Sequence, residues 1–177
     1  GQIRERHKEN SFLESRILTK DKKVHLAPPE LLEHAQKLTT DFKLEEERVG
    51  QFKLITKRAV TTHNSWTHNI ARMTDKGRET NYAYLHPDDM SRLGLQAGEL
   101  VDVKSATAAI RLPVQALDTL MPGVVAVPHG WGHQHARGLN HANKLTGVNV
   151  NILAADGPEA LDKISGMAHL TGIPVDL

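Results

Sequence analysis

The amino-acid sequence predicts a mainly β domain, closed or nearly closed into a barrel, with short peripheral helices. From Gln51 onward, short apolar runs are separated by turn signals, a spacing that is typical of barrels. Residues 124–127 (VVAV) contain no polar member, which predicts a strand buried on both faces. The 177 residues suit one medium-sized domain that can bury its own core.

Four further strands are expected before that buried one. The first carries Phe52, Leu54 and Ile55, and the second carries Tyr82, Tyr84 and Leu85. Residues 99–104 and 109–114 alternate apolar with polar side chains on either side of a turn, which predicts a hairpin. The turn Met121-Pro122-Gly123 then leads into the strand at 124–127.

Two short helices are expected outside the barrel. Residues 86–94 place a proline and two acids in the first turn, Arg92 near the end and Gly94 at the stop, so helix-capping chemistry accounts for the whole segment. A second helix starts at Pro28-Pro29 and carries apolar residues up to Leu38, three and four positions apart. It lies in a charged lead-in, residues 1–50, which precedes the barrel domain at residues 51–177.

Composition excludes several classes of function. Lys and Arg number 22 against 21 Asp and Glu, so the net charge of +1 offers no basic excess for nucleic acid. The absence of cysteine removes disulfides, thiolate metal ligands and iron–sulfur ligation. No apolar run approaches the ~20 residues that span a bilayer, so we expect a soluble segment without membrane contact. Gly1 favours a cut from a longer chain; the compartment stays open, with the cytoplasm slightly favoured.

The polar segment 56–69 (TKRAVTTHNSWTHN) directly follows the first strand. Arg58 offers a planar donor fork suited to phosphate, and hydroxyl and amide groups can hold the polar edges of a nucleotide. Trp66 could stack on a ring or cap the core. As a bare pattern, the segment also fits a polar surface loop with Trp66 tucked beneath it.

The histidines of HGWGHQH (129–135) could bring His129, His133 and His135 to one metal ion. Three protein ligands plus water form a common catalytic zinc site, so a small metal-dependent hydrolase of barrel type is the alternative function. Against it, the two glycines leave the backbone loose, and Asp156 is the next acid that could serve as a base. A ligand-facing loop explains the glycines better, because glycine lets the backbone approach a bound group closely.

Residues 136–157 hold several asparagines and few large apolar residues, which predicts a loop on the surface. Asparagine also presents a donor and an acceptor, as recognition of the edge of guanine or a pterin requires. A solvated loop and a ligand-binding loop are both open readings of this stretch.

Five segments, in this order, resemble the carboxy-terminal molybdopterin-dinucleotide-binding domain of molybdopterin oxidoreductases, the formate dehydrogenase, nitrate reductase and DMSO reductase family. They are TKRAVTTHNSWTHN (56–69), HPDDMSRLGLQAGELVDV (86–103), PGVVAVPHGWGH (122–133), GVNVN (147–151) and SGMAHLTGIPV (165–175). The resemblance extends from about Asp21 to Leu177. It implies a double-psi β-barrel, and it implies that the chain is part of a larger enzyme.

The resemblance also implies which residues hold the cofactor. The family's Thr-x-Arg strand end and the polar residues after it imply this role for Thr56, Arg58, Thr62, His63, Asn64, Ser65, Trp66, His68 and Asn69. The loop after the Pro-Gly-Val-Val strand implies it for His129, Gly130, Trp131, Gly132 and His133. An asparagine before a Leu-Thr pair completes the set: Asn151 matches best, although Asn143-Lys144-Leu145-Thr146 mimics the same pattern.

The implied cofactor is molybdopterin guanine dinucleotide, two copies of which bind one molybdenum or tungsten. The metal ligand and any iron–sulfur cluster belong, by the same resemblance, to upstream catalytic domains of the same large subunit, and electron-transfer subunits are further expected partners. This domain holds the dinucleotide and pterin and is not catalytic alone. We expect a groove lined by Arg58, Asn64 and Asn151, and an apolar face that the other domains cover.

Overall fold

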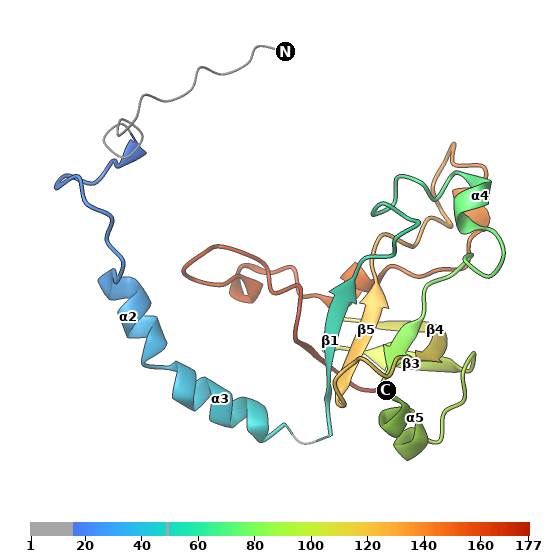
Figure 1. Ribbon diagram of the computed structural model, residues 1–177, viewed down its shortest axis with the longest axis horizontal. Helices are drawn as coiled ribbons and strands as arrows, with labels where there is room; N and C mark the ends of the chain where they lie inside the picture. The colour runs from blue at the N-terminus through green and yellow to red at the C-terminus, as the bar shows by residue number, and fades with distance from the viewer. Residues whose placement is uncertain (1–15, 49) are drawn as a thin grey trace, which may run out of the picture. The chain divides into compact units, whose positions relative to one another are not determined.

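The computed structural model describes residues 16–48 and 50–177. The chain divides into two compact units, Gly1–Glu47 and Arg48–Leu177 (Figure 1). The first 15 residues of the expected lead-in lie outside the described residues. Within the described ranges, no helix is both long and apolar enough to cross a membrane.

The described part of the first unit includes the short helices α2 (Pro29–Ala35) and α3 (Leu38–Glu46). Pro29 stands in the first turn of α2, where its missing N–H costs no hydrogen bond, and Glu30 lies at the positive end of the helix. The helix expected from Pro28 to Leu38 therefore ends at Ala35. The sequence analysis did not predict α3, because LTTDFKLEE contains only scattered apolar residues.

The second unit is a mixed sheet of six strands in the order β3-β4-β2-β5-β1-β6. The strands are β1 (Phe52–Lys57), β2 (Ala83–Leu85), β3 (Leu100–Lys104), β4 (Ala109–Ala116), β5 (Val124–Pro128) and β6 (Ile173–Val175). β1 pairs with β5, and β2 with β4, in parallel; the other neighbours are antiparallel. The five expected strands are confirmed in order, and β6 is an additional one.

The sheet is curled into a half-barrel, which confirms a mainly β fold with short peripheral helices. Its edge strands meet through a single bridge after β6. Lys104 N donates to Asp176 O at 3.0 Å, and Asp176 N donates to Lys104 O at 2.8 Å. These two bonds satisfy backbone groups that an open edge would leave exposed. The double-psi arrangement of the strands stays a prediction.

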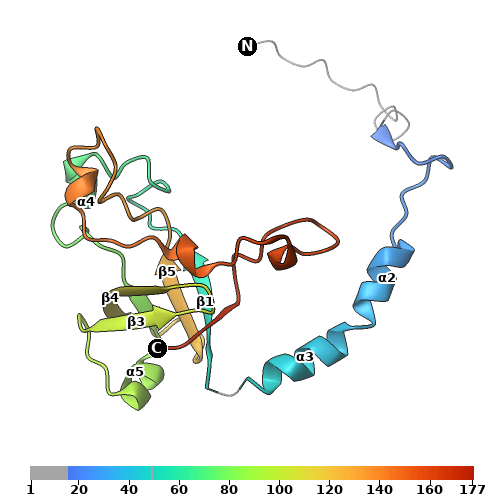
Figure 2. The ribbon, with the colours of Figure 1, turned by 180° about the vertical axis from the view of Figure 1, so that it is seen from behind.

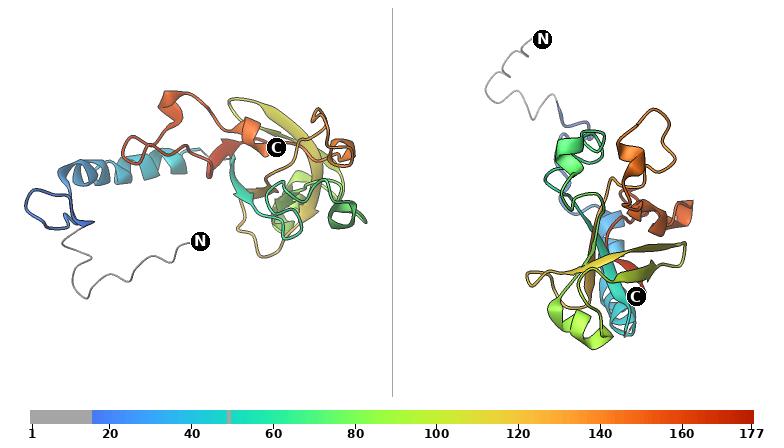
Figure 3. Two further views of the ribbon diagram at one scale, coloured as in Figure 1. Left: turned by 90° about the horizontal axis from the view of Figure 1, so that it is seen from above. Right: turned by 90° about the vertical axis from the view of Figure 1, so that its right-hand side faces the viewer.

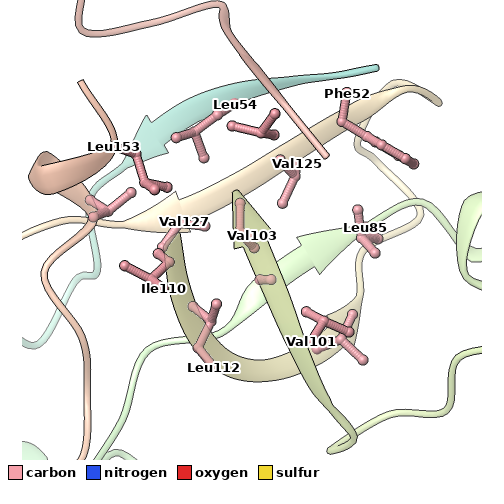
Figure 4. Packing of buried hydrophobic residues seen from close by; sticks show 14 of the residues in the cluster. Phe52, Leu54, Leu85, Val101, Val103, Ile110, Leu112, Val125, Val127 and Leu153 are labelled. Carbon is pink, nitrogen blue, oxygen red and sulfur yellow. The ribbon is translucent and has the colours of Figure 1, made fainter. Parts of the chain in front are cut away.

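The core lies inside the curl of the sheet (Figure 4). Phe52 and Leu54 of β1 alternate with less buried neighbours, as one buried face of a strand requires. Residues 125–127 of β5 are all buried, which confirms the prediction of a strand covered on both faces. The 3₁₀ helix η2 (Val150–Leu153) adds two side chains to this core, and Figure 4 places Leu153 beside the carboxyl end of β1.

α5 (Pro87–Leu93) confirms the helix expected over 86–94 and ends at Gly94, whose φ of +69° lies in the left-handed region. Asp89 is 4% exposed, and its Oδ2 accepts a hydrogen bond from Gly123 N at 2.6 Å. This bond fastens α5 to the turn before β5. It lies at the opposite end of β5 from Pro128.

Four short helical turns interrupt the loops of the second unit. They are α4 (Ala71–Thr74), η1 (Ala142–Lys144), η2 (Val150–Leu153) and η3 (Pro158–Ala160). Residues 136–157 thus run as irregular chain broken by single turns. The surface loop that their composition predicts is confirmed only in part, because Leu145, Val150 and Leu153 are buried. The right-hand view of Figure 3 shows α4 and α5 at opposite ends of the sheet.

Candidate functional site

The two polar loops singled out by the sequence leave the sheet at the same end. β1 and β5 are parallel neighbours, with Lys57 paired to Pro128, so the segments that follow them begin side by side (Figures 1 and 2). His129 N extends the pairing by donating to Lys57 O at 3.1 Å. A rigid strand pair therefore positions both loops, which is a common way for a fold to present binding residues.

A hollow of about 250 Å³ at this end brings together residues from three separate motifs. Its polar lining is Thr56 from β1, His129 after β5 and Asn151 in η2. The remaining lining residues are apolar or small: Val150, Ala154, Leu170 and Ile173. Because Thr56 follows the buried Leu54 by two residues, its side chain lies on the inner face of the strand, and the hollow opens at the mouth of the curl.

Gly130 holds the two loops in contact through its missing side chain. Its φ is +93°, and a Cβ built on it would lie 2.2 Å from Asn64 O and 3.3 Å from Ser65 N. Asn64 and the preceding His63 themselves have φ values of +61° and +42°. The close backbone approach therefore requires glycine at 130, for both conformational and steric reasons.

A buried aromatic cluster supports the loops from behind. His68 is 0% exposed and Trp131 is 6% exposed, and their ring centroids are 4.3 Å apart. His133 Nε2 lies 2.9 Å from His68 Nδ1 and 2.8 Å from Gly130 O. Since a carbonyl can only accept, His133 Nε2 carries a proton and His68 Nδ1 accepts.

This arrangement has an electrostatic consequence for His68. Burial, with the charge of His133 as the smaller cause, lowers the pKa of the His68 imidazole from 6.5 to about 4. The neutral ring carries its proton on Nε2, which has no hydrogen-bond partner among the described residues, as is true of Trp131 Nε1. Both rings thus act mainly by packing.

The other expected site residues fall into exposed and supporting groups. Arg58, His63, Asn64 and Trp66 are exposed, and Trp66, at 80%, does not cap the core.

The supporting residues bind or pack against neighbouring loops. Thr62 is buried and donates to Ala59 O at 3.2 Å, while Asn69 Oδ1 accepts from the backbone of His141 and Ala142. Ser65 is half-buried, and Gly132, with φ +101°, lies against Asn149. Neither Arg58 nor Asn64 lines the hollow beside Asn151.

The two candidate asparagines lie in different surroundings. Asn151 is exposed at the hollow, and its backbone N–H donates to Asn149 Oδ1 at 3.1 Å. Asn143 lies in η1, and its Oδ1 is buried, with no partner within the described part of the chain. Only Asn151 shares a hollow with Thr56 and His129.

The three histidines of the alternative reading do not assemble a metal site. His133 is hydrogen-bonded to His68 and Gly130, whereas His129 lines the hollow. Across residues 16–48 and 50–177, no group of three or more His, Cys, Asp or Glu side chains is placed to hold a metal ion. The hydrolase alternative is therefore not supported.

Asn81 is a site-supporting residue that the sequence analysis did not single out. Its side chain is 2% exposed and makes three hydrogen bonds. Nδ2 donates to Pro128 O at 3.0 Å and to Val148 O at 2.9 Å, and Oδ1 accepts from Val148 N at 2.9 Å. An asparagine just before a strand looks like an ordinary turn residue, so no sequence signal distinguishes it.

A second hollow, of about 290 Å³, lies on the outer face of the sheet. Tyr84 and Gln115 line it, and they alternate along their strands with core residues such as Ala83 and Val114. It contains none of the three polar residues of the first hollow.

Comparison with known families gives one extended match. The family model described as "Molydopterin dinucleotide binding domain" matches residues 52–173. The matched range begins at the first residue of β1 and ends at the first residue of β6, so it covers the other five strands completely. It also includes every residue that lines the first hollow.

Individual relatives agree with this match. A tetrathionate reductase chain of Salmonella typhimurium is 29% identical over an alignment of 147 residues, which covers 73% of this chain and 14% of that protein. An NADH-quinone oxidoreductase chain of Yersinia pestis is 43% identical over 51 residues, 29% of this chain and 6% of that protein. The sequence described here thus spans only a small part of the length of these relatives.

A solved structure supports the fold. Acetylene hydratase from Pelobacter acetylenicus superposes with a TM-score of 0.60 and 23% sequence identity. The alignment covers 78% of this chain and 19% of that protein. The curled sheet and its loops therefore have a counterpart within a much longer chain.

Proposed function

This chain belongs to the family of molydopterin dinucleotide binding domains, and from that premise we propose that residues 51–177 hold the guanine form of the dinucleotide at the hollow of Thr56, His129 and Asn151. Members of the family bind a molybdopterin dinucleotide in molybdoenzymes. The observation that carries the proposal is the convergence of these three residues, from three distant motifs, on one hollow.

The lining of the hollow fits a polar heterocycle. A hydroxyl, an imidazole and a carboxamide supply both donors and acceptors, as the edge of a pterin or guanine ring requires. Leu170 and Ile173 offer apolar surface for the face of such a ring. No carboxylate lines the hollow to repel a phosphate-bearing ligand.

The loop after β1 extends the site beyond the hollow. Arg58 follows the strand directly and is exposed, so its guanidinium is available to a pyrophosphate as a bidentate donor. His63, Asn64, Ser65 and Trp66 continue this surface. We assign the buried Thr62, His68 and Trp131, together with Asn69, Gly130, Gly132 and the half-buried His133, to holding the loops in place rather than to direct contact.

The size of the hollow indicates a shared site. Pockets that enclose a whole ligand usually measure ~300–1,000 Å³, whereas this hollow measures about 250 Å³. It suits one ring system, and the rest of the dinucleotide lies against other protein. The partners we propose are upstream catalytic domains of the same large subunit, because the chain spans only 14% of its tetrathionate reductase relative.

We propose that the parent protein is a bis-molybdopterin guanine dinucleotide oxidoreductase containing molybdenum or tungsten, and that electron-transfer subunits join it. The cofactor supplies the redox chemistry when bound, and the protein supplies binding and orientation. The chain's own residues hold the dinucleotide and shield it from water. This segment is therefore not catalytic alone, and the substrate, as in formate dehydrogenase-like or nitrate reductase-like enzymes, is bound by other domains.

The test measures cofactor retention in the parent enzyme, purified anaerobically as wild type, His129→Ala and Asn151→Ala. Fluorescent pterin oxidation products, guanine nucleotide, molybdenum and tungsten are quantified before and after extended dialysis. We expect each variant to release pterin about tenfold faster, the effect of losing one hydrogen bond worth ~1.4 kcal/mol. Thermal unfolding of each protein shows whether the fold is intact.

Matched controls use the same residue types outside the hollow. His135→Ala and Asn140→Ala change exposed residues of the loop after β5 that do not line it. These two variants should retain pterin as the wild type does. Equal retention by all four variants would contradict the assignment of the hollow, and a wild-type enzyme without pterin would contradict the proposed function itself.

A further inference from the structure

We infer that Asn81 is a positioning residue, which sets the separation of His129 and Asn151 across the hollow. The inference rests on the proposed function, because the hollow matters to the extent that it holds the dinucleotide. It concerns a side chain that lies outside the motifs and does not line the hollow.

The three hydrogen bonds of Asn81 join Pro128, at the end of β5, to the segment before η2. Nδ2 donates to Pro128 O, and His129 is the next residue along the chain. Nδ2 and Oδ1 together bind both backbone groups of Val148, which precedes Asn151 by three residues. One planar carboxamide therefore holds the approaches to both polar walls of the hollow.

The three hydrogen bonds of the Asn81 carboxamide are buried and close to ideal in length. Asn81 is 2% exposed, so water does not compete for its bonds. All three bonds measure 2.9–3.0 Å, close to the ideal length for N–H···O. A carboxamide offers two donors and an acceptor, which is the combination needed for two carbonyls and one N–H. Among the standard side chains, only glutamine has the same groups, and it is one methylene longer.

Two other side chains also hold these segments, and neither of them binds the end of β5. Gln134 Nε2 donates to Leu145 O at 3.1 Å and to Gly147 O at 2.6 Å, within the loop after β5. Thr107 Oγ1 donates to Leu153 O at 3.2 Å, at the far end of η2. Among the described residues, the side-chain hydrogen bonds that join Pro128, at the end of β5, to Val148 are those of Asn81, and they act beside the packing of Gly132 against Asn149.

Asp89 provides a matched control for a merely structural role. It is also a buried polar side chain, 4% exposed, and it also binds a backbone group at an end of β5. Its partner, Gly123, precedes β5, whereas Pro128 ends it. If Asn81 only stabilised the sheet, Asn81→Ala and Asp89→Ala would have the same effects at equal loss of stability.

The first measurement is amide hydrogen exchange in the 177-residue chain, without cofactor. In Asn81→Ala, we expect the amides of His129 and Ala154 to exchange about tenfold faster relative to that of Val114, which is bonded to Glu99 O across the hairpin of β3 and β4. In Asp89→Ala, the amide of Gly123 should accelerate instead. A uniform acceleration of all amides in Asn81→Ala would overturn the inference.

The second measurement is pterin release from the parent enzyme, with Asn81→Ala compared with Asp89→Ala. Release that is about tenfold faster only in Asn81→Ala supports the inference. Unchanged release in Asn81→Ala overturns it if His129→Ala and Asn151→Ala do lose pterin. If the amides accelerate locally but none of these three variants loses pterin, the proposed site fails while the positioning of the two segments stands.

A milder variant covers the case in which Asn81→Ala does not fold. Asn81→Ser keeps a hydroxyl that can donate to one of the two carbonyls. The same local pattern of exchange, at His129 and Ala154 but not at Val114, is then expected. Exchange that matches the wild type at all three amides would overturn the inference.

Discussion

The imidazole of His133 donates from Nε2 to Nδ1 of the fully buried His68 across 2.9 Å. The same nitrogen also faces Gly130 O, so the pair ties a buried ring to the backbone of the loop after β5. A proton added at His68 Nδ1 would face the proton of His133 Nε2 and break this bond. The pair is therefore stable only while His68 is neutral.

Stability should fall as the pH drops through the range between the two pKa values of His68. In the folded protein the pKa of the His68 imidazole is about 4, below its ordinary value of 6.5. As the pH falls, the unfolded state therefore takes up a proton at a higher pH than the folded state does. The stability that the neutral His68 gives the folded state is fully present above pH 6.5. The free energy of unfolding then falls by up to about 1.4 kcal/mol per pH unit toward pH 4. Chemical denaturation at several pH values measures this slope, which His68→Gln should reduce and His135→Gln should leave unchanged.

Gly130→Ala should destabilise the second unit by more than a left-handed backbone alone explains. Gly130 and Gly138 have φ values of +93° and +80°, but a Cβ at 138 meets nothing within 4 Å, whereas one at 130 meets Asn64 O. We expect Gly138→Ala to cost ~1 kcal/mol and Gly130→Ala ~2–4 kcal/mol. Urea denaturation of both variants is the measurement, and equal costs would show that the loops do not touch there.

Gly147→Ala should be costly because of Trp131 and not because of its own backbone. A Cβ at 147 would lie 2.2 Å from Cε3 of the Trp131 ring. Overpacking of this kind costs ~1–3 kcal/mol. The double variant with Trp131→Leu should lose less stability than the sum of the two single variants, since the clash is then gone. Additive losses in thermal denaturation would contradict the contact.

Leu54→Ala should destabilise the second unit strongly, because Leu54 lies in its core. Leu54 is 0% exposed in the centre of the core, and such truncations cost ~2–5 kcal/mol. Leu100, in β3, is 61% exposed, so Leu100→Ala should change stability by no more than ~0.5 kcal/mol. Equal unfolding midpoints for the two variants would contradict this placement of the core.

The sequence predicted the strands well where alternation or an all-apolar run was long enough. β3, β4 and β5 each carry five or more residues with a clear pattern. β6 has three residues, with Pro174 in the middle, and proline removes a strand donor. Its pairing with β1 is decided by tertiary contact, which a local pattern does not contain.

The candidate site was predictable only in part, for a similar reason. Motif order pointed to Thr56, His129 and Asn151, and the parallel pairing of β1 with β5 explains why the first two are close. The sequence offered no way to decide which tryptophan is buried: Trp131 is 6% exposed, and Trp66 is 80% exposed. Burial of a loop side chain depends on the path of the whole loop.

The segment after Gly172 pairs with β1 and bridges to β3, the two strands at which the curled sheet would otherwise have open edges. Phe52 pairs with Val175, and Lys104 bridges to Asp176, so β1 and β3 find their last partners in residues that are synthesised after the other five strands. Pairings this distant in sequence form slowly, because a long loop must close first. A nascent chain carrying β1 to β5 therefore presents unpaired strand edges until residues 173–176 leave the ribosome, and chaperones have that interval in which to bind it.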